Sequence, residues 1–167
     1  MSTLFADRIS TPIGLLVGIA DDRGRLLALE FGEESASRWK DLRWEARPLA
    51  PVATALQRYF AGELRQFAHE LAPGGTEFQE RVWQELQRIP YGETISYGEL
   101  ARRVGKPRAV RAVGRANGAN PIAIVIPCHR VIGSDGTLTG YGGGIERKRA
   151  LLALESRVAG AQAVLTA

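Results

Sequence analysis

The stretch YGELARRVGKPRAVRAVGRANG, residues 97–118, contains two short helical patterns joined by a tight connection. Ser96 and Glu99 give the first pattern the sequence of a capping box, and Gly105 ends it. Pro107 then stands where the first turn of a second helix accepts proline. Two short helices in this arrangement predict a helix-turn-helix.

The second predicted helix has one basic face. At about 100° per residue, Arg108, Arg111 and Arg115 fall within one narrow arc, and apolar residues occupy the other side. Small residues, among them Ala112 and Gly114, keep the helix slim enough to approach DNA closely. An ordinary amphipathic helix with a solvated basic face is the alternative.

The first half of the chain has the pattern of a small sheet domain. Residues 4–31 alternate short apolar strands with turns, which predicts an antiparallel meander. Helical spacing follows in residues 49–62. Pro73, Gly74 and Gly75 then mark a boundary.

The second half begins with a capping-box pattern at Thr76 and Gln79, ahead of an amphipathic helix. With the two helices already described, this predicts a mostly helical domain. The expected fold class is therefore α+β with two small domains, residues 1–73 and residues 76–167.

Downstream of the helices, residues 121–144 read PIAIVIPCHRVIGSDGTLTGYGGG and contain the only cysteine of the chain, Cys128. The run IAIVI predicts a short buried strand that ends at Pro127 and delivers Cys128 to the edge of a site. A lone cysteine is more often an inert buried side chain than a catalytic one. The adjacent His129 can raise the thiolate fraction, but contact would need a bend at Pro127 or a bridging water, because neighbouring strand residues face opposite sides.

Two further features favour a reactive thiol. Glu155 lies on the apolar stripe of the final helical pattern, where a carboxylate is costly without a partner, so we expect a Cys–His–Glu relay through His129. Solvation of Glu155 near a frayed helix end is the alternative. The glycine-rich stretch around Tyr141 matches no phosphate-binding fingerprint and predicts the wall of a flat, aromatic-sized pocket.

Composition excludes several classes of protein. One cysteine excludes an intramolecular disulfide, and one cysteine with two histidines excludes a thiolate zinc site. No apolar segment is long enough to cross a bilayer, and the N-terminus lacks a signal-peptide pattern, so we expect a soluble cytoplasmic protein. The net charge of +4, with the basic excess after residue 100, favours an anionic partner for the C-terminal half.

Five ordered blocks, ISYGELA, RAVGRANGANP, PCHRVIG, GYGGG and LLALE, resemble the O6-alkylguanine-DNA alkyltransferase family. The resemblance is close from Thr76 to about Glu155. In the first 70 or so residues it extends only to the general layout of a ribonuclease-H-like sheet. It implies a methylated-DNA–protein-cysteine methyltransferase that acts once, needs no cofactor or metal, and works as a monomer, with cooperative DNA binding left open.

The resemblance also implies roles for individual residues. Cys128 would accept the alkyl group from O6-alkylguanine, and from O4-alkylthymine, in double-stranded DNA. His129 would act through a water as the base, oriented by Glu155. Asn120 would brace the turn before the active strand, and Tyr97 would donate a proton to the departing guanine.

The same resemblance implies that the helix-turn-helix binds the minor groove and that the target base is flipped out of the duplex. Arg111 would fill the vacated place in the base stack. The following residues would line the pocket for the flipped base: Asn117, Val131, Tyr141, Gly142 and Gly143. Some relatives have serine where Gly142 stands, so only its backbone N–H could serve here.

Two alternatives remain open from the residues themselves. The chain could be a DNA-binding regulator or lesion sensor in which Cys128 is structural or redox-active. It could also be a cysteine hydrolase that uses Cys128 and His129. The stoichiometry of alkyl transfer separates these hypotheses.

Overall fold

The computed structural model describes residues 2–166 of the chain, with side chains up to residue 161. The chain forms two compact units. Unit 1 consists of the chain up to Gly74 together with Pro121–Ala123, and unit 2 consists of Gly75–Asn120 and the chain from Ile124 onward. No pattern in the sequence indicates that residues 121–123 belong to unit 1.

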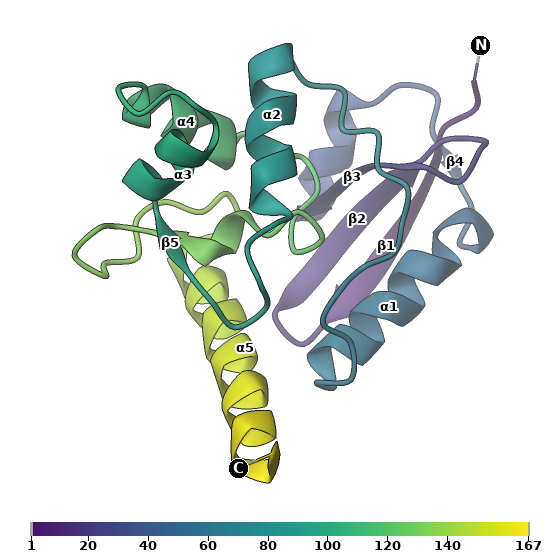
Figure 1. Cartoon of the computed structure of the whole chain (residues 1–167). Coiled ribbons are helices and arrows are strands. Elements are labelled where there is room, and N and C mark those ends of the chain that lie inside the picture. Colours follow the sequence, from purple (N-terminus) through teal and green to yellow (C-terminus); the bar gives the residue numbers. More distant parts are fainter. Residues whose placement is uncertain (1, 167) are drawn as a thin grey trace. The chain divides into compact units, whose positions relative to one another are not determined.

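Unit 1 contains the predicted antiparallel meander, which is confirmed (Figure 1). Its sheet has the strand order β3-β2-β1-β4, with β4 parallel to β1. The strands are β1 (Phe5–Thr11), β2 (Gly14–Ala20), β3 (Leu26–Phe31) and β4 (Arg43–Trp44).

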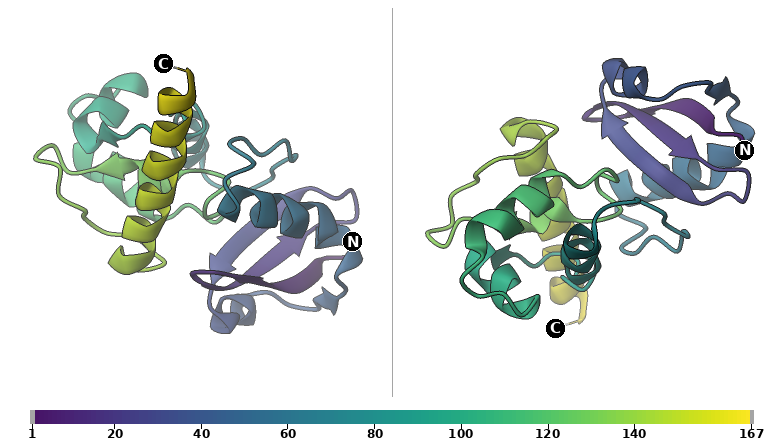
Figure 2. Two further views of the ribbon diagram at one scale, coloured as in Figure 1. Left: turned by 90° about the horizontal axis from the view of Figure 1, so that it is seen from below. Right: turned by 90° about the horizontal axis from the view of Figure 1, so that it is seen from above.

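Different segments cover the two faces of this sheet. On one face, Ala6, Val17 and Ile19 pack with Trp39, which follows the 3₁₀ helix η1 (Glu33–Arg38). The other face receives the 3₁₀ helix η2 (Arg47–Leu49) and α1 (Ala50–Phe60), which runs alongside the strands (Figure 2). A Cβ on Gly18 would lie 3.0 Å from Leu49 Cδ2, so glycine permits the close packing of this face.

The outer edge of β3 is paired with two distant segments of unit 1. The Leu29 amide donates to the carbonyl of Pro121 at 2.8 Å, and the Ala123 amide donates to the carbonyl of Leu29 at 2.8 Å. The Leu26 amide donates in the same way to the carbonyl of Glu70 at 2.9 Å. These bonds satisfy backbone groups that an edge strand would otherwise leave open.

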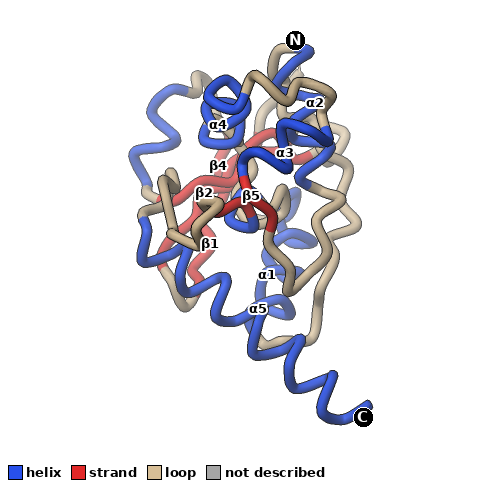
Figure 3. The backbone as a smooth tube through the Cα atoms, turned by 60° about the vertical axis from the view of Figure 1, so that its left-hand side comes forward, coloured by secondary structure: helices blue, strands red, loops and turns tan. Residues whose placement is uncertain are grey.

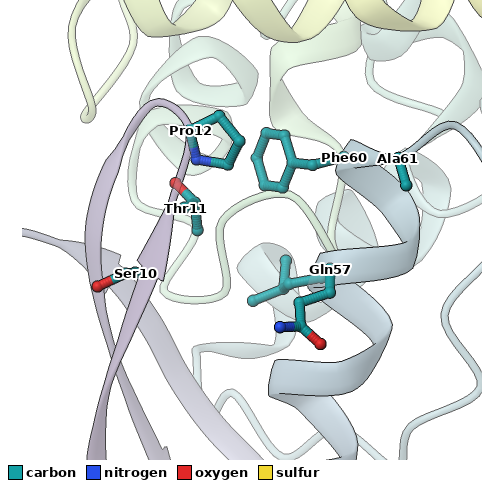
Figure 4. A pocket seen from close by; sticks show the side chains of 7 residues that line it. Ser10, Thr11, Pro12, Gln57, Phe60 and Ala61 are labelled. Atoms are coloured by element: carbon teal, nitrogen blue, oxygen red, sulfur yellow. The ribbon is translucent and has the colours of Figure 1, made fainter.

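A pocket of about 350 Å³ lies between the end of β1 and α1 in unit 1 (Figure 4). No cysteine, histidine or charged side chain lines it, so the Ser10 and Thr11 hydroxyls in its wall have no acid or base beside them in the lining. Its lining consists of Ser10, Thr11, Pro12, Leu56, Gln57, Phe60 and Ala61.

Unit 2 is mostly helical, with one small parallel sheet of β5 and β6 (Figure 3). The expected α+β class, with an N-terminal sheet domain and a helical C-terminal domain, is confirmed. Within residues 2–166, no helix combines the length and the apolar character that crossing a bilayer requires. The elements of unit 2 are α2 (Glu77–Leu86), β5 (Ile95–Ser96), α3 (Tyr97–Arg103), α4 (Val110–Gly118), the 3₁₀ helix η3 (Cys128–Arg130), β6 (Val131–Ile132) and α5 (Ile145–Thr166).

The two predicted capping boxes form to different extents. At α2 the box is complete, because Thr76 Oγ1 accepts from the Gln79 amide and Gln79 Oε1 accepts from the Thr76 amide. At α3 only half of it forms, with Ser96 Oγ accepting from the Glu99 amide at 3.1 Å. The Glu99 carboxylate instead binds arginines in the last turn of the same helix.

The second helix of the helix-turn-helix begins at Val110, so the prediction of a helix from Pro107 is wrong. The Ala109 amide donates to the carbonyl of Lys106, which closes a turn with Pro107 at its second position. Proline favours that turn position because its φ is fixed. Arg108 therefore lies in the turn before α4 and not on its face.

The predicted active-site strand does not form. Ile122 makes a single bridge to Leu29 within unit 1, and Ile124 has φ 71°, which is rare for a β-branched residue. The chain then continues as a turn up to Cys128, which begins η3. The run is buried as expected, but a turn and not a strand positions the thiol.

Candidate active site

Cys128 lies at the start of η3 with 7% of its surface exposed. Its amide donates to the carbonyl of Ile126 at 2.8 Å, and its carbonyl accepts from the Val131 amide. Burial raises the pKa of the thiol, and Asn120 and Lys148 act in the opposite direction. The resting thiol is thus buried beside groups that favour its ionisation.

The predicted contact between His129 and Glu155 is present. His129 Nε2 lies 2.8 Å from Glu155 Oε2, and both side chains are almost fully buried. Burial alone would raise the pKa of Glu155, but hydrogen bonds from His129 and Arg130 hold it at about 2. Because α5 continues to Thr166, the alternative of a solvated Glu155 at a frayed helix end is wrong.

His129 has one ring nitrogen left for chemistry. Burial lowers its pKa, even though Glu155 raises it, so the imidazole is neutral at neutral pH. The Glu155 carboxylate can only accept, which places the ring proton on Nε2. Nδ1 is buried and has no hydrogen-bond partner among the described residues, so its lone pair can take up a proton.

Arg130 is part of this network, and the sequence analysis missed it. Its Nε donates to Glu155 Oε1 at 2.7 Å and a terminal nitrogen donates to Oε2 at 3.0 Å. A second terminal nitrogen donates to the carbonyl of Ile89 at 2.8 Å, and the guanidinium lies 5.6 Å from the ring centroid of Tyr91. The only signal in the sequence was its place directly after His129.

Lys148, in the first turns of α5, is a second buried cation that the sequence analysis missed. It precedes Leu151, Leu152 and Glu155 at helical spacing, and its neighbours in the sequence are the half-buried Arg147 and the exposed Arg149. A lysine at the start of an apolar face commonly extends its ammonium into solvent, so this spacing alone does not indicate burial.

Two asparagines hold the turn that carries the thiol. Asn120 Nδ2 donates to the carbonyl of Ile126 at 2.8 Å, in the place where a brace was expected. Asn117, on α4, is buried, and its Nδ2 lies 3.5 Å from the carbonyl oxygen of Cys128. Its Oδ1 has no hydrogen-bond partner among the described residues. The end of α4 is therefore connected directly to the turn that carries Cys128 (the acceptor turn in the proposals below).

Tyr97 joins α3, α4 and the glycine-rich loop. Its hydroxyl donates to the carbonyl of Thr139 at 2.9 Å. A Cβ on Gly114 would lie 3.7 Å from the Tyr97 ring, so the ring packs against α4 in ordinary contact. Ala112 is half-buried on the same helix.

The expected pocket residues come from three segments: Asn117 from α4, Val131 from β6, and Tyr141, Gly142 and Gly143 from the glycine-rich loop. Tyr141 is largely buried, burial raises its pKa well above the usual value, and its hydroxyl has no partner within the described chain. Val131 is fully buried in β6. Gly142 faces open space, and the carbonyl of Gly143 accepts from Arg147 at 3.0 Å.

The basic residues divide between α4 and the turn before it. Arg111 and Arg115 are exposed on α4, and Arg108 is exposed in the preceding turn. In the described part of the chain, no three His, Cys, Asp or Glu side chains come close enough to hold a metal ion. The site is therefore a thiol, a neutral imidazole and a charge-paired carboxylate beside a basic helix.

Comparison with known proteins identifies the family. Residues 5–73 match the model for the ribonuclease-like domain of 6-O-methylguanine DNA methyltransferase, and residues 77–157 match the model for its DNA binding domain. The methylated-DNA–protein-cysteine methyltransferase of Mycobacterium bovis is 64% identical over 159 residues, which cover 94% of this chain and 95% of that protein. The Salmonella typhimurium protein of the same name is 46% identical over 164 residues, covering 91% and 95%.

A solved structure gives the same result. The crystal structure of Mycobacterium tuberculosis OGT in complex with DNA matches with a TM-score of 0.86 and 50% identity, covering 92% of this chain and 94% of that one. The family expected from the five sequence blocks is confirmed. The chain belongs to the 6-O-methylguanine DNA methyltransferase family.

Proposed function

We propose that this protein repairs O6-alkylguanine in double-stranded DNA by transferring the alkyl group to Cys128 in a single, irreversible turnover. Family membership supports alkyl transfer to a cysteine. The observation that carries the assignment to this thiol is the neutral His129 next to Cys128, with Nε2 held by Glu155 at 2.8 Å and Nδ1 unused among the described residues.

The proposed reaction moves one proton and one alkyl group. The Cys128 thiol loses its proton through a water to His129 Nδ1, and the sulfur attacks the alkyl carbon in line with the bond to O6. The S–C bond forms as the C–O bond breaks. Tyr97 donates its proton to the departing guanine and recovers one from the His129 imidazolium through solvent. The product is a thioether, which offers no acyl or disulfide centre for regeneration.

Access to the base requires that it leave the duplex, because a stacked base cannot reach a buried thiol. In this proposal α3 and α4 bind the minor groove, and Arg111 takes the vacated place in the base stack. The exposure of Arg111 and Arg115 on α4 supports this arrangement. So does the hydrogen bond of Asn117, which joins the end of α4 to the acceptor turn.

The flipped base would lie among Asn117, Val131 and the loop of Tyr141, Gly142 and Gly143. Two buried atoms have no hydrogen-bond partner among the described residues: Asn117 Oδ1 can accept a hydrogen bond from the base, and the Tyr141 hydroxyl can donate one to it or accept one from it. Gly142 leaves open space beside its backbone. We include O4-alkylthymine as a second substrate and a monomer as the acting species.

The test is a stoichiometry measurement with duplex DNA that contains methyl-labelled O6-methylguanine. We expect one methyl group per protein molecule, followed by a complete stop, with the methyl group on the Cys128 peptide by mass spectrometry. Cys128→Ala is the matched control and should bind the same DNA without accepting the label. Continued turnover would indicate a hydrolase, and binding of the lesion without transfer would indicate a sensor or regulator.

A further inference from the structure

Lys148 is completely buried, which is rare for a lysine without a compensating partner. Its ammonium donates to three backbone carbonyls. The acceptors are Val131 at 2.6 Å, Thr139 at 3.0 Å and Gly140 at 3.3 Å. One ammonium therefore connects α5 to β6, directly after the acceptor turn, and to the glycine-rich loop.

While Cys128 is protonated, the buried side chains around it carry more positive than negative charge. Two cations, Arg130 and Lys148, are buried, but Glu155 is the only buried carboxylate of the C-terminal unit within the described residues. Arg130 and His129 both bind that carboxylate. No carboxylate in the described chain forms an ion pair with Lys148. A buried charge without an opposite charge is costly, so its retention needs a reason.

We propose that Lys148 is a positioning residue that supplies the counter-charge of the Cys128 thiolate and fixes the glycine-rich loop to the acceptor turn. This role of Lys148 rests on the proposed alkyl transfer, because the thiolate is needed only if Cys128 reacts. Ionisation of Cys128 would place a negative charge in the same buried region as the Lys148 ammonium, which binds the carbonyl of Val131 directly after η3.

The electrostatics of the pair agree with this geometry. The Lys148 charge lowers the pKa of Cys128, which burial raises, and a Cys128 thiolate raises the pKa of Lys148, which burial lowers. The other titratable or charged groups that act on this region are His129, Glu155, Arg130, Tyr97, Tyr141 and Arg147. The one carboxylate among them, Glu155, forms no ion pair with Lys148 in the described chain.

Lys148 also positions the glycine-rich loop, because its ammonium binds carbonyls of that loop. The carbonyl oxygen of Thr139 accepts two hydrogen bonds. One comes from the Lys148 ammonium and the other from the Tyr97 hydroxyl, at 2.9 Å. The ammonium lies 5.9 Å from the centroid of the Tyr97 ring. Lys148 therefore helps to hold the proposed proton donor and the acceptor turn in one arrangement.

The test is an ultraviolet titration of the Cys128 thiolate in the wild type, K148M and K148R, with the corresponding Cys128→Ala proteins as blanks. Cys128 is the only cysteine, so the difference signal reports one thiol. We expect K148M to raise the midpoint by about 1 pH unit or more, and K148R to restore part of the shift. A K148M midpoint equal to that of the wild type would overturn the proposal.

A reciprocal measurement avoids any change at Lys148. The side-chain ammonium of Lys148 is titrated by nuclear magnetic resonance in the wild type and in C128A. If the two groups are coupled, removing the thiolate must lower the pKa of Lys148 by as much as removing the ammonium raises that of Cys128. An unchanged Lys148 titration would refute the coupling, even if K148M failed to fold.

Transfer kinetics then connect the coupling to function. K148M should slow single-turnover methyl transfer at neutral pH, and the defect should shrink as the pH rises and the thiolate forms. A purely structural role would slow transfer equally at every pH. Neither titration uses DNA, so failure of the wild type to transfer a methyl group would contradict the proposed function without altering the result for Lys148.

Discussion

At the scale of single residues, burial decides the protonation state of His129. Its pKa is lowered from the ordinary 6.5, because a buried imidazolium is poorly solvated. The imidazole therefore remains a base at pH 6.5, and protonation removes it only at lower pH. We expect the rate of single-turnover transfer to stay level as the pH falls through 6.5 and to decrease below it. A series of rates at fixed ionic strength checks this, and a decline centred above pH 6.5 would contradict it.

Arg130 provides a stability prediction at the same scale. Arg130→Met removes the two hydrogen bonds that Arg130 donates to the buried Glu155 carboxylate, while the His129 contact remains. Breaking a buried pair in this way costs about 3–5 kcal/mol. Urea denaturation at neutral pH measures the free energy of unfolding. Arg157→Met, at an exposed position of α5, is the control and should change it by less than about 0.5 kcal/mol.

The sequence predicted the contact between His129 and Glu155 better than it predicted the surroundings of that pair. Cys128, His129 and Glu155 could be proposed because a thiol beside an imidazole, and a carboxylate on an apolar stripe, are unusual in any context. Arg130 and Lys148 could not, because a basic side chain looks the same in sequence whether it is solvated or buried. Only the path of α5 and the glycine-rich loop places both cations inside the unit.

At the scale of elements, α4 carries the proposed DNA contacts. Arg111→Ala and Arg115→Ala should each weaken binding to duplex DNA. Arg115→Ala should also reduce the slope of log K against log salt concentration by about 1, because it removes one cation near the phosphates. Arg157→Ala, exposed on α5, should leave the slope unchanged. Binding titrations at several salt concentrations measure the effect, and equal slopes for all the variants would argue against contact through α4.

Local chemistry explains which elements were predictable. The α2 cap needs only Thr76 and Gln79, three residues apart, so sequence specifies it. The segment before Cys128 depends on the Asn120–Ile126 hydrogen bond and on pairing of residues 121–123 with Leu29, more than 90 positions earlier. An apolar run does not reveal such bonds, and a buried turn was therefore read as a strand.

At the scale of the whole molecule, the first unit is discontinuous in sequence. The backbone groups of Leu29 pair with Pro121 and Ala123, so a protein that ends at Gly74 lacks both partners. We expect the Leu29 amide to exchange hydrogen much faster in residues 1–74 than in the full chain. The Leu26 amide, which donates to the carbonyl of Glu70, is the internal control and should keep its protection. Equal protection of Leu29 in both proteins would show that residues 121–123 contribute little.

This topology also constrains the order of events during synthesis. Most domains fold as units as they leave the ribosome, starting with the N-terminal one. Here the part of the β3 edge at Leu29 stays open until residue 123 has emerged, by which time α2, α3 and α4 have already been made. Two backbone groups at Leu29 therefore stay unpaired in the nascent sheet until three residues have emerged that immediately precede the turn carrying Cys128.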